Sequence, residues 1–339
     1  MTRRHWILAT AGVALGRDSA PESAIYQGLV WLLSRQSADG GWHSRTYGLL
    51  RSGQSLTALI FDTLAMLGDH AGPRGEAALE KAAGFIRRHL NAEGALGLAD
   101  DVPDYPTYAT ALALRGAVRR NSTLFDTSRM ISWLESRQFA EHAGWTRAGS
   151  AYGGWGIGAG ILAAPHPGHI DLSMTRFALE ALAAAGRPAS DPAFERSRVF
   201  LSRCQHPDGG FFFSPVVTDA NKAGEDGGSY RPYGSATADG ILALRASGGD
   251  PEKAQAWLRR HDSPVLPAGF DAPARQRYAR GLRFYYAEAA SQIERSVDWR
   301  GPLMREQRPD GSWCNPEPLV KEDDPLIATA LAIRALAAE

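Results

Sequence analysis

Apolar residues recur along the chain at helical spacing, and no segment alternates as a strand would. Ile25, Leu29 and Leu32 fall on one face of a helix. Segments of a second kind, such as 174–185, are small and apolar on nearly all sides. A helix that is hydrophobic all round is buried, whereas a helix with one apolar face is half-exposed. The pattern therefore predicts helix pairs, each with an outer and an inner member.

A short motif follows several of the outer helices: a Gln, a Gly four residues later and an aromatic residue six residues later. The clean copies are Gln36, Gly40 and Trp42; Gln205, Gly209 and Phe211; and Gln307, Gly311 and Trp313. The looser copies are Gln138 with Gly144 and Trp145, and Leu90 with Gly94 and Leu96. Glycine costs about 1 kcal/mol inside a helix but supplies the left-handed backbone that a helix end needs. We therefore interpret the motif as structural: the Gln bridges helices, and the aromatic ring packs against the next pair.

A second motif lies in the inner helices, where a Thr precedes a Leu by seven residues. Its copies are Thr57 with Leu64, Thr175 with Leu182, Thr237 with Leu244, and Thr329 with Leu336. An eroded copy is Thr110 with Ala117, and the run 284–286 marks a missing one. The first and last Thr are 272 residues apart, so five steps give a period near 54. Helix pairs without polar capping repeats favour a closed unit, because an open solenoid needs capped ends. The predicted fold is all-α: an α/α toroid of six hairpins, forming one domain over residues 21–339.

Residues 1–20 are set apart from this domain. Arg3 and Arg4 precede a short apolar stretch, and Ser19 and Ala20 offer small residues for cleavage. The segment resembles a twin-arginine export signal, which implies an exported protein. The alternative is a first turn that packs against the domain.

Charge and cysteine content exclude several function classes. The chain has 339 residues with 37 basic and 37 acidic side chains, so its net charge is zero. This balance argues against nucleic-acid binding and against a polybasic membrane anchor. No apolar run reaches the roughly 20 residues of a membrane helix. The two cysteines, Cys204 and Cys314, form neither a disulfide framework nor a paired zinc spacing.

The Gln-Gly-aromatic motif resembles the repeat of squalene and oxidosqualene cyclases and, more loosely, that of protein prenyltransferase β subunits. The resemblance covers most of the chain after residue 21, and it implies a central cavity for an isoprenoid. The cyclases protonate an alkene with an Asp-x-Asp-Asp-Thr segment at the start of an inner helix. The matching stretch here runs from Asp171 to Thr175, with Ser173 where the proton donor would be and Met174 in place of the last Asp. The zinc ligands of the prenyltransferases have no match at Cys204 or Cys314.

Candidate chemistry gathers near the starts of the inner helices. If the protein is an enzyme, the acid comes from His169, Asp171 or Asp239; Asp171 is the first choice by position, and Asp239 is the second. Asp239 lies inside an inner helix, where burial would raise its pKa, with Arg245 or a tyrosine such as Tyr233 as a partner. Tyrosines at or near inner-helix starts are candidates to line an apolar pocket: Tyr105, Tyr108, Tyr230, Tyr233, Tyr285 and Tyr286.

Two imidazoles and a carboxylate, His166, His169 and Asp171, also lie within six residues. They offer a divalent-metal site, although a single short cluster is weak evidence for one. The alternative is a helix cap formed by Asp171. The acidic runs 100–101 and 322–324 have the same capping explanation.

Two hypotheses of different classes follow. In the first, the toroid is an isoprenoid enzyme of terpene cyclase or prenyltransferase type with a hydrophobic small-molecule ligand. In the second, it is a non-catalytic exported toroid that acts as a binding or scaffold protein, because the acidic motif is eroded and the zinc ligands are absent.

Overall fold

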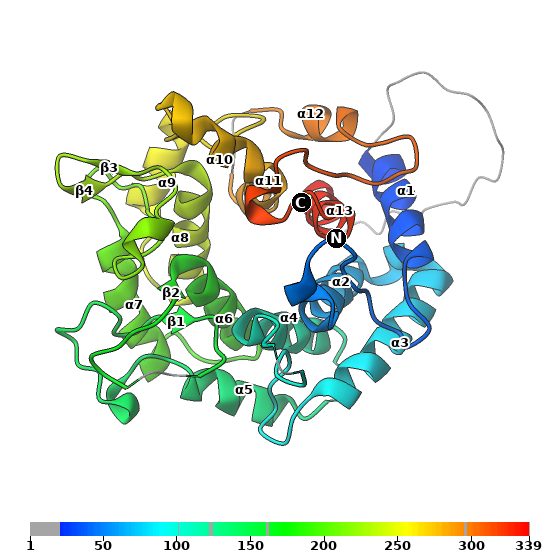
Figure 1. Cartoon of the computed structure of the whole chain (residues 1–339), viewed down its shortest axis with the longest axis horizontal. Coiled ribbons are helices and arrows are strands. Elements are labelled where there is room, and N and C mark those ends of the chain that lie inside the picture. Colours follow the sequence, from blue (N-terminus) through cyan, green and yellow to red (C-terminus); the bar gives the residue numbers. More distant parts are fainter. Residues whose placement is uncertain (1–20, 101, 122–124, 161–162, 295–296, 339) are drawn as a thin grey trace.

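Two concentric layers of helices make up the protein (Figure 1). The computed structural model describes residues 21–100, 102–121, 125–160, 163–294 and 297–338. The segment interpreted as an export signal lies outside these residues.

The inner layer contains the Thr-bearing helices, as the repeat predicts. Its members are α2 (Gln54–Leu67), α4 (Pro106–Arg119), α6 (Leu172–Ala184), α8 (Gly234–Ala246), α11 (Arg283–Ser291) and α13 (Pro325–Ala337). Each contacts the next in chain order, and α13 returns to contact α2. The ring is therefore closed, which confirms the α/α toroid. Helix α11 occupies the place of the missing Thr copy, where the sequence has the run 284–286.

The outer layer alternates with the inner one along the chain. It consists of α1 (Pro21–Ser34), α3 (Gly72–His89), α5 (Thr127–Ser136), α7 (Pro192–Cys204), α9 (Glu252–Arg260) and α12 (Arg300–Arg305), while α10 (Gln276–Gly281) leads into α11. The outer helices bury only one face; in α9 the buried residues are Ala254, Trp257 and Leu258. Short 3₁₀ segments are η1 (Gly48–Leu50), η2 (Gly68–Ala71), η3 (Glu141–Ala143), η4 (Thr218–Ala220), η5 (Pro273–Arg275) and η6 (Pro318–Val320).

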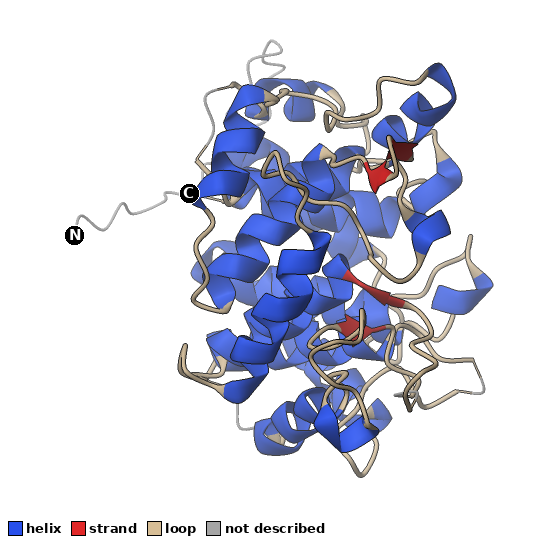
Figure 2. Ribbon diagram, turned by 90° about the vertical axis from the view of Figure 1, so that its left-hand side faces the viewer, coloured by secondary structure: helices blue, strands red, loops and turns tan. Residues whose placement is uncertain are grey.

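Two small antiparallel strand pairs lie to one side of the helical layers (Figure 2). In the first pair, β1 (Trp155–Gly156) lies against β2 (Ile170–Asp171), which leads directly into α6. In the second, β3 (Glu225–Asp226) pairs with β4 (Ser229–Tyr230), shortly before α8. Both pairs therefore stand at the end of the toroid where the inner helices begin.

The two sequence motifs are parts of one hydrogen-bonded joint. The backbone N–H of Trp42 donates to the Thr57 hydroxyl at 3.0 Å, and Trp313 donates to Thr329 in the same way at 3.0 Å. Phe211 with Thr237 and Leu96 with Thr110 repeat this bond at 3.0 Å and 2.9 Å. In these four inner helices the Thr thus holds the turn that follows the preceding outer helix.

The Gln and the Gly of the motif join neighbouring outer helices at several of its copies. The Gln36 side chain donates to the carbonyl of Ala78 in α3 at 2.8 Å, and Gln307 donates to Ala24 in α1 at 2.9 Å. Gly40 has a φ of +91°, and a Cβ there would stand 2.4 Å from the carbonyl oxygen of Lys81. Only glycine permits both this backbone conformation and this close approach. The bond from Gln307 to α1 closes the outer ring.

One copy of the motif differs from the sequence prediction. Gln138 donates to the carbonyls of Gly153 and Ala193, and Trp155, rather than Trp145, donates its backbone N–H to Thr175. Gln138 and Trp155 are 17 residues apart instead of six, so eleven residues are inserted. The assignment of Gly144 and Trp145 was wrong because the insertion carries its own Gly-Trp pair.

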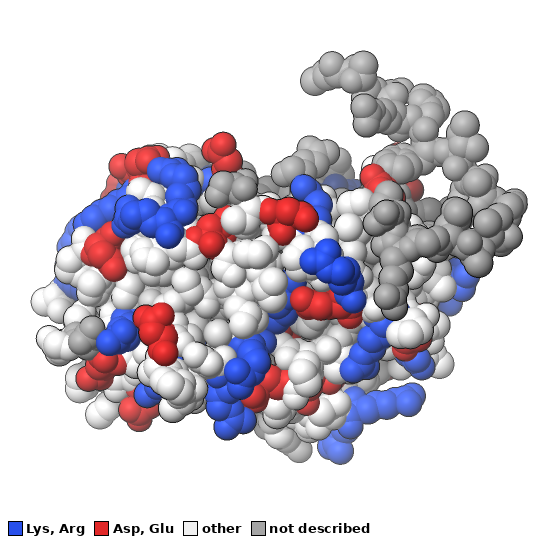
Figure 3. All heavy atoms as spheres, turned by 90° about the horizontal axis from the view of Figure 1, so that it is seen from above, with Lys and Arg blue, Asp and Glu red and all other residues white. Residues whose placement is uncertain are grey.

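The surface matches the zero net charge. Figure 3 shows Lys and Arg side chains interspersed with Asp and Glu on one face of the molecule. Among the described helices, none combines the length and the apolar character that crossing a bilayer requires.

Candidate functional site

Buried charged side chains on the inner helices contact one another around the axis of the toroid. They are Asp62 on α2, Arg115 on α4, Arg176 and Glu180 on α6, Asp239 on α8, Glu288 on α11 and Arg334 on α13. Every inner helix thus contributes at least one. Burying an isolated charge costs much free energy, so these groups have to pair with one another to be stable inside the protein.

Six of these side chains form a closed circuit of ion pairs, called here the ion-pair ring. In order, Asp62 pairs with Arg115 (2.7 Å), Arg115 with Glu180, Glu180 with Arg176 (3.0 Å), Arg176 with Glu288 (3.0 Å), Glu288 with Arg334 (3.2 Å) and Arg334 with Asp62 (2.8 Å). Burial opposes ionisation of Asp62, but Arg115 and Arg334 outweigh it and lower its pKa to about 2. Asp62 therefore carries its negative charge within the ring.

Asp239 is attached to this ring and behaves differently. Arg176 donates to one carboxylate oxygen at 3.0 Å, Ser173 donates to the other at 2.8 Å, and the Tyr285 hydroxyl reaches both at 3.1 Å and 2.9 Å. Burial raises the pKa of Asp239 to about 6, against the opposing effects of Arg176 and the hydroxyl donors. A carboxyl group with this pKa gains and loses a proton near neutral pH.

A tyrosine is a partner of Asp239, as predicted, but it is Tyr285 rather than Tyr233, and the arginine is Arg176 rather than Arg245. Arg245 donates instead to the backbone carbonyl of Gln292, and Tyr233 packs its ring against Phe270, with the centroids 5.1 Å apart. The actual partners come from α6 and α11, which flank α8 on its two sides.

Ser173 links Asp239 to the resemblance with the cyclases. Ser173 occupies the position at which those enzymes carry the proton donor, and its hydroxyl donates to Asp239. The carboxyl group of α8 thus stands one hydrogen bond from the place where the acid of α6 would be.

Asp171 is a helix cap. One of its carboxylate oxygens accepts from the backbone N–H of Met174 at 2.8 Å, and the other lies 3.2 Å from Nδ1 of His169. This hydrogen bond with Asp171 raises the pKa of His169, whose side chain is 42% exposed. His166 is exposed, and no group of three or more His, Cys, Asp or Glu side chains within the described chain is arranged to hold a metal.

The acidic run 322–324 caps inner helices as well. Glu322 accepts from the backbone N–H groups of Phe284 and Tyr285 at the start of α11, at 2.9 Å and 2.7 Å. Asp324 accepts from Leu326 at the start of α13 at 2.9 Å. In the other run, Asp100 is exposed and Asp101 lies outside the described residues.

The six candidate tyrosines separate into two groups. Three lie on α11 and α4 or directly before α4: Tyr285 donates to Asp239, Tyr108 packs edge-on against Phe177 of α6 at 4.6 Å, and Tyr105 precedes α4 with a φ of +44°. The other three make contacts elsewhere. Tyr230 packs against Phe212 and Tyr233 against Phe270, while the buried Tyr286 donates to Asp262.

Sequence reasoning missed the ion-pair ring, although a signal for it exists. A charged residue follows the motif Thr by five positions in four inner helices, as Asp62, Arg115, Glu180 and Arg334. A charge at one fixed position of otherwise apolar repeats indicates that these residues meet around a common axis. The buried thiol of Cys204 needs no such role, since it is part of the hydrophobic core.

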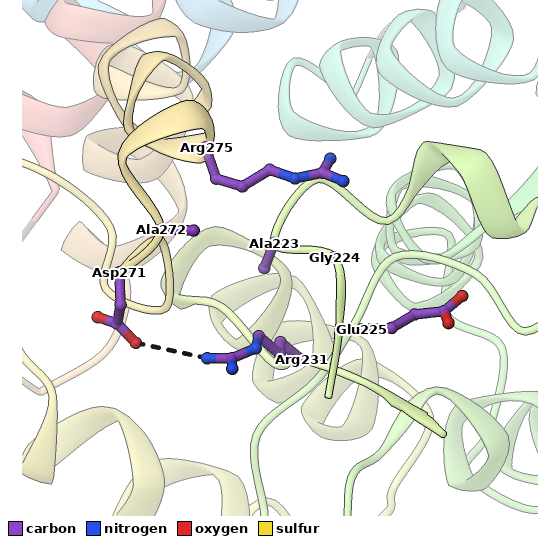
Figure 4. Close-up of a pocket in the computed structure, with 7 residues that line it drawn as sticks. All are labelled: Ala223, Gly224, Glu225, Arg231, Asp271, Ala272 and Arg275. Carbon is purple, nitrogen blue, oxygen red and sulfur yellow. Dashed lines mark ion pairs between the residues drawn. The ribbon is translucent and has the colours of Figure 1, made fainter. Parts of the chain in front are cut away.

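Two surface pockets lie away from the axial groups. One, of about 410 Å³, lies between the β3–β4 segment and the start of α10 (Figure 4). In it Arg231 faces Asp271 at 3.8 Å, whereas Glu225 points away from both. The other, of about 520 Å³, lies between 48–52 and 99–102.

Comparison with known proteins supports the fold. No protein-family model and no curated protein matches the sequence. Among solved structures, a variant of the type II terpene cyclase MstE from Scytonema, in complex with geranylgeranyl dihydroxybenzoate, aligns with a TM-score of 0.55 at 15% identity, covering 94% of this chain and 96% of the other. A protein from Actinoplanes aligns at 0.58 with 18% identity, covering 94% of this chain and 100% of the other.

The fold is that of the type II terpene cyclases. This agrees with the resemblance seen in the repeat motif. An unsaturated glucuronyl hydrolase specific for heparin also aligns, with a TM-score of 0.57 at 11% identity over 93% of this chain and 95% of the other. The terpene-cyclase-like toroid is therefore shared with glycosidases, and the chemistry has to be argued from the axial residues.

Proposed function

We propose that the protein is a terpene-cyclase-like enzyme in which Asp239 protonates an alkene of an isoprenoid bound at the axis of the toroid. The observation that carries this proposal is the position of Asp239. It is a buried acid with a pKa of about 6, one hydrogen bond from the position of the acid in the resembled cyclases.

The chemistry requires a proton on Asp239 and a stable conjugate base. The π electrons of the alkene form a new C–H bond with the carboxyl proton, which leaves a carbocation on the neighbouring carbon and a carboxylate on Asp239. Arg176 and the hydroxyls of Ser173 and Tyr285 then stabilise that carboxylate, because all three donate to it. Attack by a second alkene closes a ring, and loss of a proton completes the product.

Aromatic residues of the inner helices supply the remaining requirement, which is stabilisation of the carbocation. A carbocation is stabilised by the faces of aromatic rings, as other cations are. Tyr108, Tyr285 and Phe177 lie on the inner helices near Asp239 and Arg176, and Arg176 itself lies 4.9 Å from the Phe177 ring centre. These rings are suited to contact the chain of the ligand.

The test compares products from wild type and carboxyl-to-amide variants. Geranylgeranyl diphosphate, geranylgeraniol and squalene are incubated with each protein, and cyclic products are measured by gas chromatography and mass spectrometry. We expect Asp239→Asn to lower turnover by about 10²- to 10⁴-fold, the usual contribution of a positioned acid. Asp191→Asn, at the cap of outer helix α7, is the matched control and should retain turnover.

Loss of activity in Asp171→Asn with full activity in Asp239→Asn would move the acid to α6 and contradict the proposal. So would turnover confined to an unsaturated uronic acid disaccharide, which belongs in the substrate panel because of the glucuronyl hydrolase alignment.

A binding role without catalysis is the second candidate, and the ion-pair ring favours it. The ring places charged groups at the middle of the inner helices, so an apolar ligand is restricted to the end where these helices begin. Binding of an isoprenoid without any conversion would select this alternative.

A further inference from the structure

Two lysines, Lys222 and Lys321, lie half-buried at the end of the toroid that carries Asp239. Within the described part of the chain, neither ammonium group forms an ion pair. The Lys222 Nζ lies 4.1 Å from the ring centre of Phe213. The Lys321 Nζ lies 5.7 Å from the ring of Tyr47 and 5.6 Å from that of Tyr105. Aromatic rings are thus the partners of both ammonium groups.

The lysines occupy similar places in two repeats, each just after a short 3₁₀ segment. Lys222 follows η4 and precedes α8, while Lys321 follows η6 and precedes α13. Both α8 and α13 contact α11, the helix that presents Tyr285 to Asp239. Lys321 also adopts a φ of +68°, which is uncommon outside glycine and often marks a functional position.

Electrostatics connects the lysines with the acid. Burial lowers the pKa of Lys222, and Lys321 lowers it further, whereas Asp171 and Asp239 act in the opposite direction. Lys222 therefore lies within electrostatic reach of Lys321 as well as of the carboxylates of Asp171 and Asp239. A half-buried cation that forms no ion pair is costly, and a bound anion would lower that cost for both groups.

We propose that Lys222 and Lys321 together bind the anionic head group of the ligand. This inference rests on the proposed function and defines its substrate class: an isoprenoid that carries a diphosphate or a carboxylate, rather than a neutral hydrocarbon. Tyr47, Tyr105 and Phe213, which support the lysines, then offer apolar surface to the adjoining part of the chain.

The arginines of the surface pocket in Figure 4 are less suited to this role. Arg231 faces Asp271, and Arg275 donates to the backbone carbonyl of Lys222 at 3.4 Å. Arg275 instead helps to position the segment from which the Lys222 side chain extends.

The experiment measures the affinity of farnesyl diphosphate, farnesoic acid and farnesol by isothermal titration calorimetry at low salt. We expect both anionic ligands to bind at least about tenfold more tightly than farnesol, which is the effect of one charge-assisted hydrogen bond. Lys222→Met and Lys321→Met should each lose about that factor for the anionic ligands and nothing for farnesol. Lys253→Met, at an exposed lysine of α9, is the matched control.

Competition with inorganic pyrophosphate distinguishes a diphosphate head group from a carboxylate. Competition by pyrophosphate, with farnesyl diphosphate as the tightest ligand, indicates a diphosphate; tight binding of farnesoic acid alone indicates a carboxylate. Equal affinity for farnesol, absence of binding, or unchanged affinity in both lysine variants with native circular dichroism would overturn the inference.

The outcome is distinguishable from that of the proposed function. Lysine-dependent binding without turnover would contradict the proposed enzymatic function and support the anion site. Asp239-dependent turnover of a neutral isoprenoid with no effect of the lysines would do the reverse.

Discussion

At the scale of single residues, Asp239 is a buried carboxyl group whose protonation changes near neutral pH. Its position inside an apolar inner helix was sufficient to predict burial and a raised pKa, because these depend on the helix alone. Its partners were not predictable, since Ser173, Arg176 and Tyr285 come from two other helices. A pattern along one segment does not indicate which residues of another will meet it.

The raised pKa of Asp239 predicts a pH-dependent stability. The native protein binds this proton more tightly than the unfolded chain, whose pKa is near 3.8, so stability falls as the pH rises through about 6. The difference corresponds to roughly 3 kcal/mol at neutral pH. Asp239→Asn lacks this titration but keeps an oxygen for Arg176. Its Tm relative to wild type should therefore increase between pH 4 and pH 7, as measured by scanning calorimetry; a constant difference would show that Asp239 does not titrate in this range.

At the scale of elements, the repeat motifs made the toroid predictable. In the copy at Gln36, the Gln side chain reaches the next outer helix, the Gly has a left-handed backbone, and the backbone N–H of the aromatic residue donates to the Thr of the inner helix. The copy at Gln138 was misassigned, because an insertion changes the spacing but not the joint. The spacing of residues does not reveal an insertion that itself contains a Gly-Trp pair like that of the motif.

Two Gly-to-Ala substitutions test the joint. Gly40→Ala would place a methyl group 2.4 Å from the carbonyl oxygen of Lys81 in a left-handed backbone, so we expect a loss of about 2–4 kcal/mol. Gly84→Ala, inside α3, has only the end of the Arg88 side chain nearby at 3.6 Å and should gain up to about 1 kcal/mol. Urea unfolding measures both, and similar values for the two variants would argue against a structural need for glycine at position 40.

At the scale of the whole molecule, the ion-pair ring joins the beginning and the end of the chain. Arg334 contacts Asp62, which lies 272 positions earlier, and also reaches Glu288. The five-residue offset from the motif Thr and the signs of the charges are visible in the sequence, but the pairing of the charges depends on closure in three dimensions.

Breaking the ring should be much more costly than breaking a surface pair. Arg334→Met leaves Asp62 and Glu288 with fewer partners, and we expect a loss of about 3–5 kcal/mol. Arg259→Met removes the exposed pair with Glu252 and should cost less than about 1 kcal/mol. If both variants unfold at nearly the same urea concentration as wild type, the ring does not stabilise the closed toroid.

The most direct measurement of the central claim follows the proton itself. Wild type and Asp239→Asn are incubated in D₂O with geranylgeranyl diphosphate, and the cyclic product is examined by mass spectrometry. Because the proton on Asp239 exchanges with solvent before it is transferred to carbon, we predict one non-exchangeable deuterium in the wild-type product and at least about 100-fold less product from Asp239→Asn. A cyclic product without deuterium, or the same amount of labelled product from both proteins, would contradict protonation by Asp239.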